Sequence, residues 1–213
     1  MTDEPYLRLL LKPALKDPVL VEGLPGFGEV GKLAAGLLIK FIRAKPFAEL
    51  YSPYFPDYVF IRENGICRLP RYEFFASTTC VPNIVVLTGD LQPSAEEVLG
   101  HYDLCSMILD LAQRVNCKKL ITLGGYPTQM PRASGIYVAA TSESLAASLA
   151  RQGASIYQGG SIVGAAGLVL GLAKLRGLEG GCILSATPGI FPDNAAATAV
   201  FQFLIKVLGL KQL

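Results

Sequence analysis

Histidine is almost absent from this sequence, and the little that is present has no catalytic setting. The single residue, His101, lies in no pattern that would supply a triad with its base, and no G-x-S-x-G segment occurs to present a nucleophile. The five cysteines, at positions 67, 80, 105, 117 and 182, are scattered without a C-x-x-C pair. A triad hydrolase and a structural zinc site are therefore disfavoured, and we expect reduced thiols.

An excess of charge is also missing, since 19 Lys and Arg against 17 Asp and Glu leave a net charge of +2. That value is too small to predict a nucleic-acid or membrane-surface partner. The longest uncharged stretch, residues 154–173, contains five glycines and several polar residues, so it predicts a buried helix rather than a membrane span. The N-terminus lacks the apolar segment of a signal peptide. We expect a cytoplasmic protein.

The chain does contain a large apolar fraction, 51%, organised as short apolar segments that alternate with helical patterns. The patterns predict strands at 19–21, 83–88, 119–123, 136–140 and 182–185, and helices at 29–43, 94–115, 143–150, 161–175 and 194–208. Without a linker or repeat, residues 1–213 are expected to form a single domain. This alternation predicts an α/β fold, a three-layer α/β/α sandwich with a mixed, mostly parallel sheet, because the Pro- and Tyr-rich segment 47–76 favours hairpins.

Two of the predicted helices have a recognisable start. Ser94 and Glu97 form an S-x-x-E capping box directly after Pro93, and Asp193 is a suitable N-cap for the last helix. The helix at 161–175 contains several glycines, which are unfavourable in a helix and therefore indicate close approach of its backbone to the sheet or to another subunit.

A glycine-rich loop, Gly23–Lys32 (GLPGFGEVGK), follows the first predicted strand and opens a helix. Its glycines match the dinucleotide pattern G-x-G-x-x-G at Gly26, Gly28 and Gly31, and G-x-x-x-x-G-K ending at Lys32 matches a phosphate loop without its final Ser or Thr. Glu49 follows 23 residues after the first of these glycines, roughly where a ribose-binding acid would lie.

Three features weaken the nucleotide interpretation. Leu33 stands where a phosphate loop has its magnesium ligand, Glu29 would repel a phosphate at the helix N-terminus, and Asp90 does not directly follow its strand. The alternative is structural, because Pro25-Gly26 favours a turn and glycines allow tight packing. The structural interpretation is favoured, while a nucleotide or another small ligand stays open.

The segment Thr88–Pro93 (TGDLQP) leaves the end of a buried strand, where α/β proteins often bind ligands. Asp90 and Gln92 are suited to contact a ligand, but they are also suited to bond local backbone amides, which is the favoured role. A ligand, if bound, is expected at the strand ends near residues 26–31, 90–92 and Gly124-Gly125.

Three blocks of the chain together resemble the PAC2 family, the proteasome assembly chaperone 2 family, and its archaeal members in particular. They are 23–31 (GLPGFGEVG), 89–92 (GDLQ) with the helix that follows, and 160–193, and the resemblance covers residues 18–209. The family-motif and candidate ligand-cleft residues are Gly23, Pro25, Gly26, Gly28, Gly31, Gly89, Asp90, Gln92, Gly124, Gly125, Gly160, Gly164 and Asp193.

The resemblance implies a fold similar to that of nucleoside phosphorylases and a non-catalytic homo-oligomer without cofactor or metal. The expected partners are proteasome α subunits or the 20S core particle. Some archaeal members dock through a C-terminal tail that ends in a hydrophobic residue, Tyr and any residue. Here the last three residues are Lys211-Gln212-Leu213, so this docking mode is not expected. The alternative function is a small-molecule or nucleotide-binding enzyme or sensor.

Overall fold

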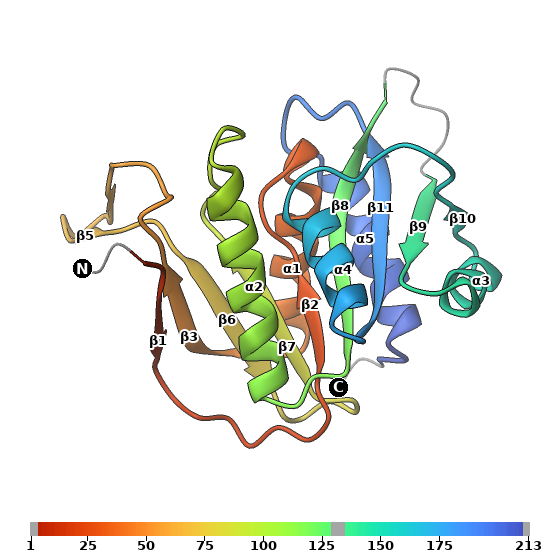
Figure 1. Ribbon diagram of the computed structural model, residues 1–213, viewed down its shortest axis with the longest axis horizontal. Helices are drawn as coiled ribbons and strands as arrows, with labels where there is room; N and C mark the ends of the chain where they lie inside the picture. Colours follow the sequence, from red (N-terminus) through yellow and green to blue (C-terminus); the bar gives the residue numbers. More distant parts are fainter. Residues whose placement is uncertain (1–3, 129–134, 211–213) are drawn as a thin grey trace.

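The computed structural model describes residues 4–128 and 135–210. Its main feature is a nine-stranded sheet built from β1 (Tyr6–Leu9), β2 (Val19–Glu22), β3 (Lys45–Tyr51), β6 (Tyr72–Ser77), β7 (Ile84–Gly89), β8 (Lys119–Pro127), β9 (Ile136–Ala140), β10 (Ser155–Ile156) and β11 (Glu179–Thr187). The strand order is β1-β3-β6-β7-β2-β8-β11-β9-β10 (Figure 1). A separate hairpin joins β4 (Phe60–Ile61) to β5 (Cys67–Arg68).

The short strand β2 occupies the middle of the sheet, and all four of its residues are buried. It runs parallel to β7 on one side and to β8 on the other, and β8 is in turn parallel to β11. The outer strands β1, β3 and β6 pair antiparallel. The sheet is mixed, as predicted, but only four of its eight strand pairs are parallel, so "mostly parallel" overstates the parallel share.

Helices cover both faces of the sheet. They are α1 (Val30–Phe41), α2 (Val98–Arg114), α3 (Glu143–Arg151), α4 (Ala165–Leu175) and α5 (Asn194–Val207). Buried side chains of α2 and α4, such as Ile108 and Val169, form one apolar cluster with one face of the sheet. Those of α1 and α5, such as Leu38 and Leu204, form a second cluster with the opposite face. These two clusters give the three layers that the sequence predicts (Figure 1). The likeness to nucleoside phosphorylases stays a prediction.

Two predicted helix starts are wrong. α2 begins at Val98 rather than Ser94, because the Glu97 N–H donates to the Ser94 carbonyl oxygen and closes a turn ahead of the helix. The Ser94–Glu97 capping box therefore does not form. α4 begins at Ala165 rather than Ser161, because Gly164 has a φ of 82°, outside the helical region. The Asp193 cap is confirmed, since its side chain accepts from the Ala196 N–H.

Among the residues that the structure describes, no helix combines the length and the apolar character needed to cross a membrane. The same residues contain no cluster of His, Cys, Asp and Glu that could hold a metal ion. Four of the five cysteines are buried and all are unpaired. Burial raises the pKa of the Cys105, Cys117 and Cys182 thiols to about 12, so these groups stay protonated and unreactive at neutral pH.

Candidate functional site

A pocket of about 420 Å³ opens at the edge of the sheet where β2, β8 and β11 end. Its lining comes from the end of β2, the glycine-rich loop, Gln92 after β7, the end of β8, the segment before α4 and the loop after β11. The neighbours of β2 on its two sides are β7 and β8, which both come later in the sequence, so the chain connections lead away from β2 in opposite directions. A crevice at the carboxyl ends of such strands is the usual ligand site of α/β sheets.

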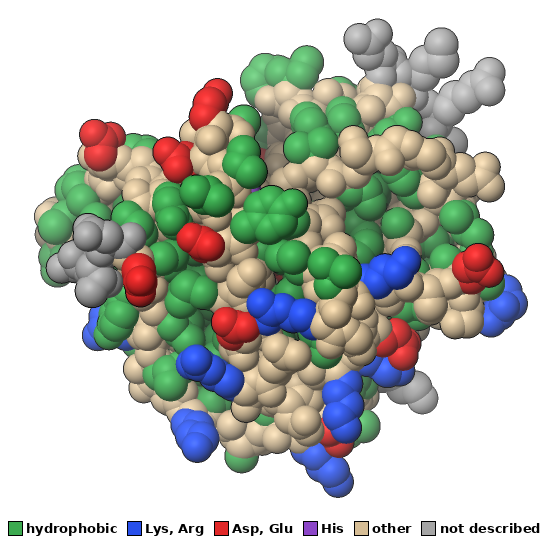
Figure 2. Space-filling model, viewed as in Figure 1, with side chains coloured by type: hydrophobic (Ala, Val, Ile, Leu, Met, Phe, Trp, Pro, Cys, Tyr) green, Lys and Arg blue, Asp and Glu red, His purple; other side chains and the backbone are tan. Residues whose placement is uncertain are grey.

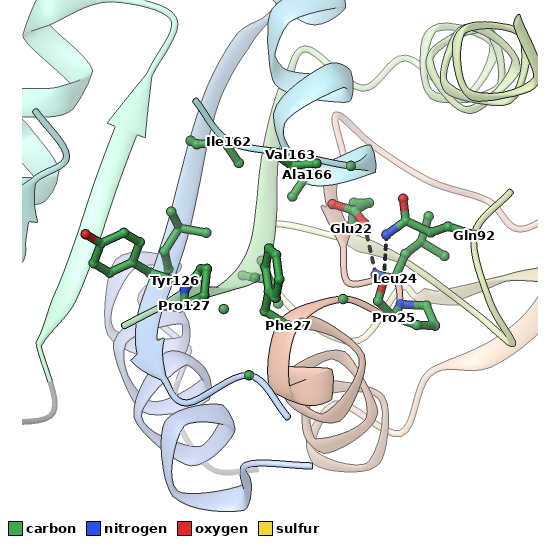
Figure 3. Close-up of a pocket in the computed structure, with 18 of the residues that line it drawn as sticks. Glu22, Leu24, Pro25, Phe27, Gln92, Tyr126, Pro127, Ile162, Val163 and Ala166 are labelled. Carbon is green, nitrogen blue, oxygen red and sulfur yellow. Dashed lines mark hydrogen bonds between the residues drawn. The ribbon is translucent and has the colours of Figure 1, made fainter. Parts of the chain in front are cut away.

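Glu22, the last residue of β2, lines this pocket and is 1% exposed. Its Oε1 accepts a hydrogen bond of 2.9 Å from the Leu24 N–H. Its Oε2 is buried and has no hydrogen-bond partner among the described residues. Burial raises the pKa of this carboxyl to about 7, and the bond from Leu24 opposes the shift only in part. Figure 3 shows the free oxygen on the side of the pocket where the Phe27 ring stands.

Aromatic rings form much of the pocket wall. Phe27, Tyr126 and Tyr157 all line it, and the rings of the two tyrosines lie 5.5 Å apart in an edge-to-face arrangement. Of the described lining residues, Glu22 is the one that carries a charged group. A site of this composition is suited to a flat, uncharged or positively charged molecule rather than to an anion.

Small residues on the pocket wall leave the space open. A Cβ atom added at Gly124 would lie 3.0 Å from Leu184 Cδ2 and 3.8 Å from Ala166 Cβ, both of which belong to lining residues. At Gly164 the positive φ of 82° is unfavourable for other residues, and an added Cβ would lie 3.1 Å from Gln92 Oε1. The open space of the pocket therefore depends on glycine at position 124 in β8 and at position 164 directly before α4.

The structure brings together about half of the predicted cleft residues. Seven of the thirteen line the pocket: Pro25, Gly26, Gly31, Gln92, Gly124, Gly125 and Gly164. The other six lie outside the lining: Gly23, Gly28, Gly89, Asp90, Gly160 and Asp193. The predicted ligand-cleft residues therefore lie only in part around this pocket, and their role in binding a ligand stays a prediction.

Three amides in the middle of the glycine-rich loop are already hydrogen-bonded within the protein and are not free for a phosphate. The N–H groups of Gly28, Glu29 and Val30 donate to the carbonyl oxygens of residues 189, 26 and 27, respectively. The Lys32 ammonium lies 3.4 Å from the Glu29 carboxylate and 3.5 Å from the Asp90 carbonyl oxygen. Its positive charge is therefore already paired with a carboxylate rather than free to bind a phosphate. The geometry favours the structural interpretation of this loop.

Two glycines of the loop lie where no side chain fits. A Cβ atom on Gly23 would overlap the Gly31 carbonyl oxygen, and one on Gly31 would overlap the Leu123 carbonyl oxygen. These contacts bring the start of α1 against the loop and against β8. Gly26 differs, because no atom lies within 4 Å of the Cβ position, and it faces the pocket.

The three polar residues of the predicted site hold the chain around the pocket. The Asp90 carboxylate accepts two bonds from Arg68, of 2.6 and 2.7 Å, and one from the Arg71 N–H. The Gln92 amide joins two segments, since Nε2 donates to the Pro25 carbonyl oxygen and Oε1 accepts from the Ala165 N–H at the start of α4 (Figure 3).

Asp193 joins the end of β11 to α5. Besides capping the helix, its Oδ2 accepts from the Thr187 hydroxyl at 2.9 Å, and its N–H donates to the Gly28 carbonyl oxygen. Asp193 thus has local contacts at the start of α5. The local role predicted for Asp90 and Gln92 is wrong, because Asp90 pairs with the Arg68 side chain and Gln92 bonds the backbone of Pro25 and Ala165, all distant in the sequence.

Glu49 is not a ribose-binding acid of this site. It lies on β3, which is separated from β2 by β6 and β7, whereas a dinucleotide fold needs that strand beside the first one. Its carboxylate pairs instead with Arg71 at 2.9 Å and with Arg8 at 3.6 Å. Glu49 follows the glycine-rich loop at the expected number of residues, but the chain between them places β3 near the edge of the sheet rather than beside β2.

Sequence reasoning missed the residues that give the pocket its chemistry, namely Glu22, Phe27, Tyr126 and Tyr157. For Glu22 a signal existed, because a carboxylate directly ends the apolar strand Val19-Leu-Val21. A charged residue at the end of a strand that is buried on both faces is costly unless it has a partner or a function.

Comparison with known proteins found a match between residues 20–212 and the PAC2 family. PbaB of Pyrococcus furiosus, an archaeal proteasome activator, is 36% identical with a TM-score of 0.93, and the similarity covers 99% of this chain and 91% of PbaB. PbaA of the same organism, an archaeal homologue of proteasome-assembly chaperone, is 29% identical with a TM-score of 0.81, over 96% and 82% of the two chains. The Methanocaldococcus jannaschii protein MJ1210 is 36% identical over 195 residues, which are 91% of this chain and 74% of that protein.

Proposed function

Because the chain belongs to the PAC2 family, we propose that it is a non-catalytic protein of the proteasome-assembly-chaperone type that acts as a homo-oligomer. Its partners would be proteasome α subunits or the 20S core particle. The observation that carries this proposal is the similarity to PbaB, which extends over nearly the whole of both chains. A surface for binding a protein partner that the whole fold forms in PbaB would therefore also be formed by this chain.

The chemistry of the pocket supports a binding role over turnover. Asp90 and Asp193 are engaged with Arg68 and with the start of α5, and so neither is available as a general acid or base. Asp90 and Asp193 lie outside the lining, so Glu22 is its one carboxyl group, and the described lining contains no Cys, Lys or His.

Exposed apolar side chains surround the mouth of the pocket. We define the apolar rim as Phe27, Val163, Ile190 and Phe191, of which the last two are each 78% exposed. Figure 2 shows hydrophobic side chains along the upper edge of the molecule, where Figure 1 places the ends of β8 and β11. Large apolar side chains grouped in this way are typical of surfaces that bind protein.

Binding is tested by capturing α subunits and assembled core particle separately on the immobilised full chain. The double variant Ile190→Ser and Phe191→Ser is expected to weaken capture on the order of tenfold or more, because apolar anchors dominate such interfaces. Leu175→Ser is the matched control, since Leu175 is 84% exposed but lies at the C-terminal end of α4. Failure of the unmodified protein to bind either target would contradict the proposal.

The C-terminal residues on which tail docking depends, Lys211-Gln212-Leu213, lie outside the described residues. Tail docking is distinguished from the apolar rim by removing these three residues. We expect capture to be unchanged, because Gln212 replaces the penultimate Tyr. A truncated chain that no longer binds would assign the contact to the tail.

A second function, binding of a small molecule, is favoured by one observation, the unpaired buried oxygen of Glu22 in the pocket. A nucleotide is a poor candidate, because the amides of residues 28–30 and the Lys32 ammonium are already engaged. Thermal-shift measurements with ATP and NAD are expected to show no stabilisation. A rise in Tm with either compound would revive the nucleotide alternative, since saturating ligand stabilises the folded state.

A further inference from the structure

The buried end of β2 has a polar requirement that the fold leaves unmet. Glu22 Oε2 is buried without a hydrogen-bond partner among the described residues. A buried carboxyl oxygen without a partner is rare, because it loses its hydration and receives nothing in return. It lies next to a pocket large enough for a small organic molecule.

We propose that the pocket binds a small organic cation, an amine or amidine carried on a flat apolar body, with one N–H group donating to Glu22 Oε2. The ligand is expected to carry a positive charge, because the described lining residues include the Glu22 carboxyl group and no basic side chain. Phe27, Tyr126 and Tyr157 supply apolar surface to the pocket, which suits the flat body of such a ligand.

The carboxyl group is already withdrawn from water before any ligand arrives, so its desolvation is a cost of folding rather than of binding. A ligand loses only its own hydration and gains a charge-assisted hydrogen bond in a low-dielectric site. An anion of the same shape would meet an unpaired carboxylate and would be rejected. A neutral isostere with an N–H donor would make the bond without the charge.

Access to the oxygen requires one side chain to move, because Oε2 itself is shielded from solvent. Phe27 is the lining side chain best suited to do this, since it is 45% exposed and lines the same pocket. It belongs to a single turn, Phe27–Glu29, rather than to a long element. Rotation of this ring would admit a nitrogen group while the glycine walls stay in place.

Isothermal titration calorimetry of the full chain with benzamidine, benzamide and benzoate tests the proposal, because the three probes share a ring and differ in charge. At about pH 8, where Glu22 is ionised, we expect affinity to decrease in the order benzamidine, benzamide, benzoate, the last without detectable binding. No benzamidine binding, or equal binding of benzoate, would overturn the proposal.

Two variants locate the site. Glu22→Gln should weaken benzamidine by about tenfold or more, toward the affinity of benzamide. Ala166→Phe, which fills the pocket and leaves residue 22 a glutamate, should abolish binding of both. The exposed Glu63→Gln is the matched control and should change nothing. If Glu22→Gln failed to fold, the preference for benzamidine over benzoate and its loss in Ala166→Phe would still decide the matter.

The outcome is separable from the proposed partner function. Ala166→Phe should leave capture of α subunits unchanged, because Ala166 is not part of the apolar rim. Benzamidine binding that survives both Glu22→Gln and Ala166→Phe would place the cation elsewhere and would refute the site described here.

Discussion

The Glu22 carboxyl group lies at the end of the central strand β2 and has no cationic partner among the described residues. The titratable groups that interact with it are the Tyr72 phenol on β6, the Cys105 thiol on α2 and the Cys182 thiol on β11. Burial raises the pKa of all three, so they are neutral between pH 4 and pH 8 and cannot compensate a charge on Glu22. Ionisation of this one residue therefore opposes the folded state.

Replacing this carboxyl group should change how stability depends on pH. The folded pKa of Glu22 is about 7 and the ordinary value is 4.5, so the folded state holds a proton that the unfolded state releases in that window. The free energy of unfolding should fall as pH rises from 4.5 to about 7, by about 3 kcal/mol for this group. Urea unfolding of Glu22→Gln should lack this decrease, making the variant the more stable protein at high pH.

The control for that measurement is Glu63→Gln, which removes a carboxyl group from an exposed turn. Its pH dependence should follow that of the unmodified chain, because all other titrating groups are shared. Identical pH profiles for Glu22→Gln and the unmodified protein would mean that Glu22 is not perturbed in the folded state.

Two glycines on the same helix should respond in opposite directions to alanine. Gly31→Ala places a methyl group against the Leu123 carbonyl oxygen and should destabilise the protein by roughly 2 kcal/mol or more. Gly36→Ala adds its methyl group where no atom lies within 4 Å and should stabilise by about 0.5–1 kcal/mol through helix propensity. Thermal or urea unfolding measures both, and equal effects would contradict close packing at Gly31.

The role of a residue was predictable from sequence where the residue type itself points to a backbone requirement, as glycine does in a tight turn. Gly23 and Gly31 were expected to pack tightly, and they do, Gly23 against the start of α1 and Gly31 against β8. The role of Glu22 was not predictable in the same way. Its burial depends on β7 and β8 lying on both sides of β2, and neither contact is encoded within the loop itself.

At the scale of elements, most strands and helices follow from hydrophobic period, while their first residues depend on side-chain partners. The Ser94 hydroxyl bonds the Glu96 carboxylate instead of capping a helix, so the predicted capping box fails. The strands β1 and β10 were missed because each is short, with four residues in β1 and two in β10. The order of strands in the sheet could not be deduced from period at all.

The start of α5 provides a test of capping at this scale. Asp193→Ala removes the acceptor for the Ala196 N–H and for the Thr187 hydroxyl, and it should cost about 1–2 kcal/mol of stability. Asp193→Asn keeps an acceptor of the same shape and should lose clearly less. Chemical denaturation measures the difference, and equal losses in the two variants would show that the cap contributes little.

At the scale of the whole molecule, the distribution of apolar side chains predicts self-association. Besides the apolar rim, Val98 and Leu99 are exposed at the start of α2, at 56% and 74%. Native mass spectrometry and light scattering of the full chain should show a homo-oligomer that Leu99→Ser weakens. A monomer at every concentration tested would contradict this expectation.

Strand β11 lies between β8 and β9, although both of these strands precede it in the chain. During synthesis on a ribosome, β8 and β9 emerge well before the segment that will join them. Until residues 179–187 arrive, the growing polypeptide exposes unpaired strand edges to other nascent chains. A messenger RNA truncated ahead of that segment would thus yield a product prone to aggregation rather than a smaller working version of the protein.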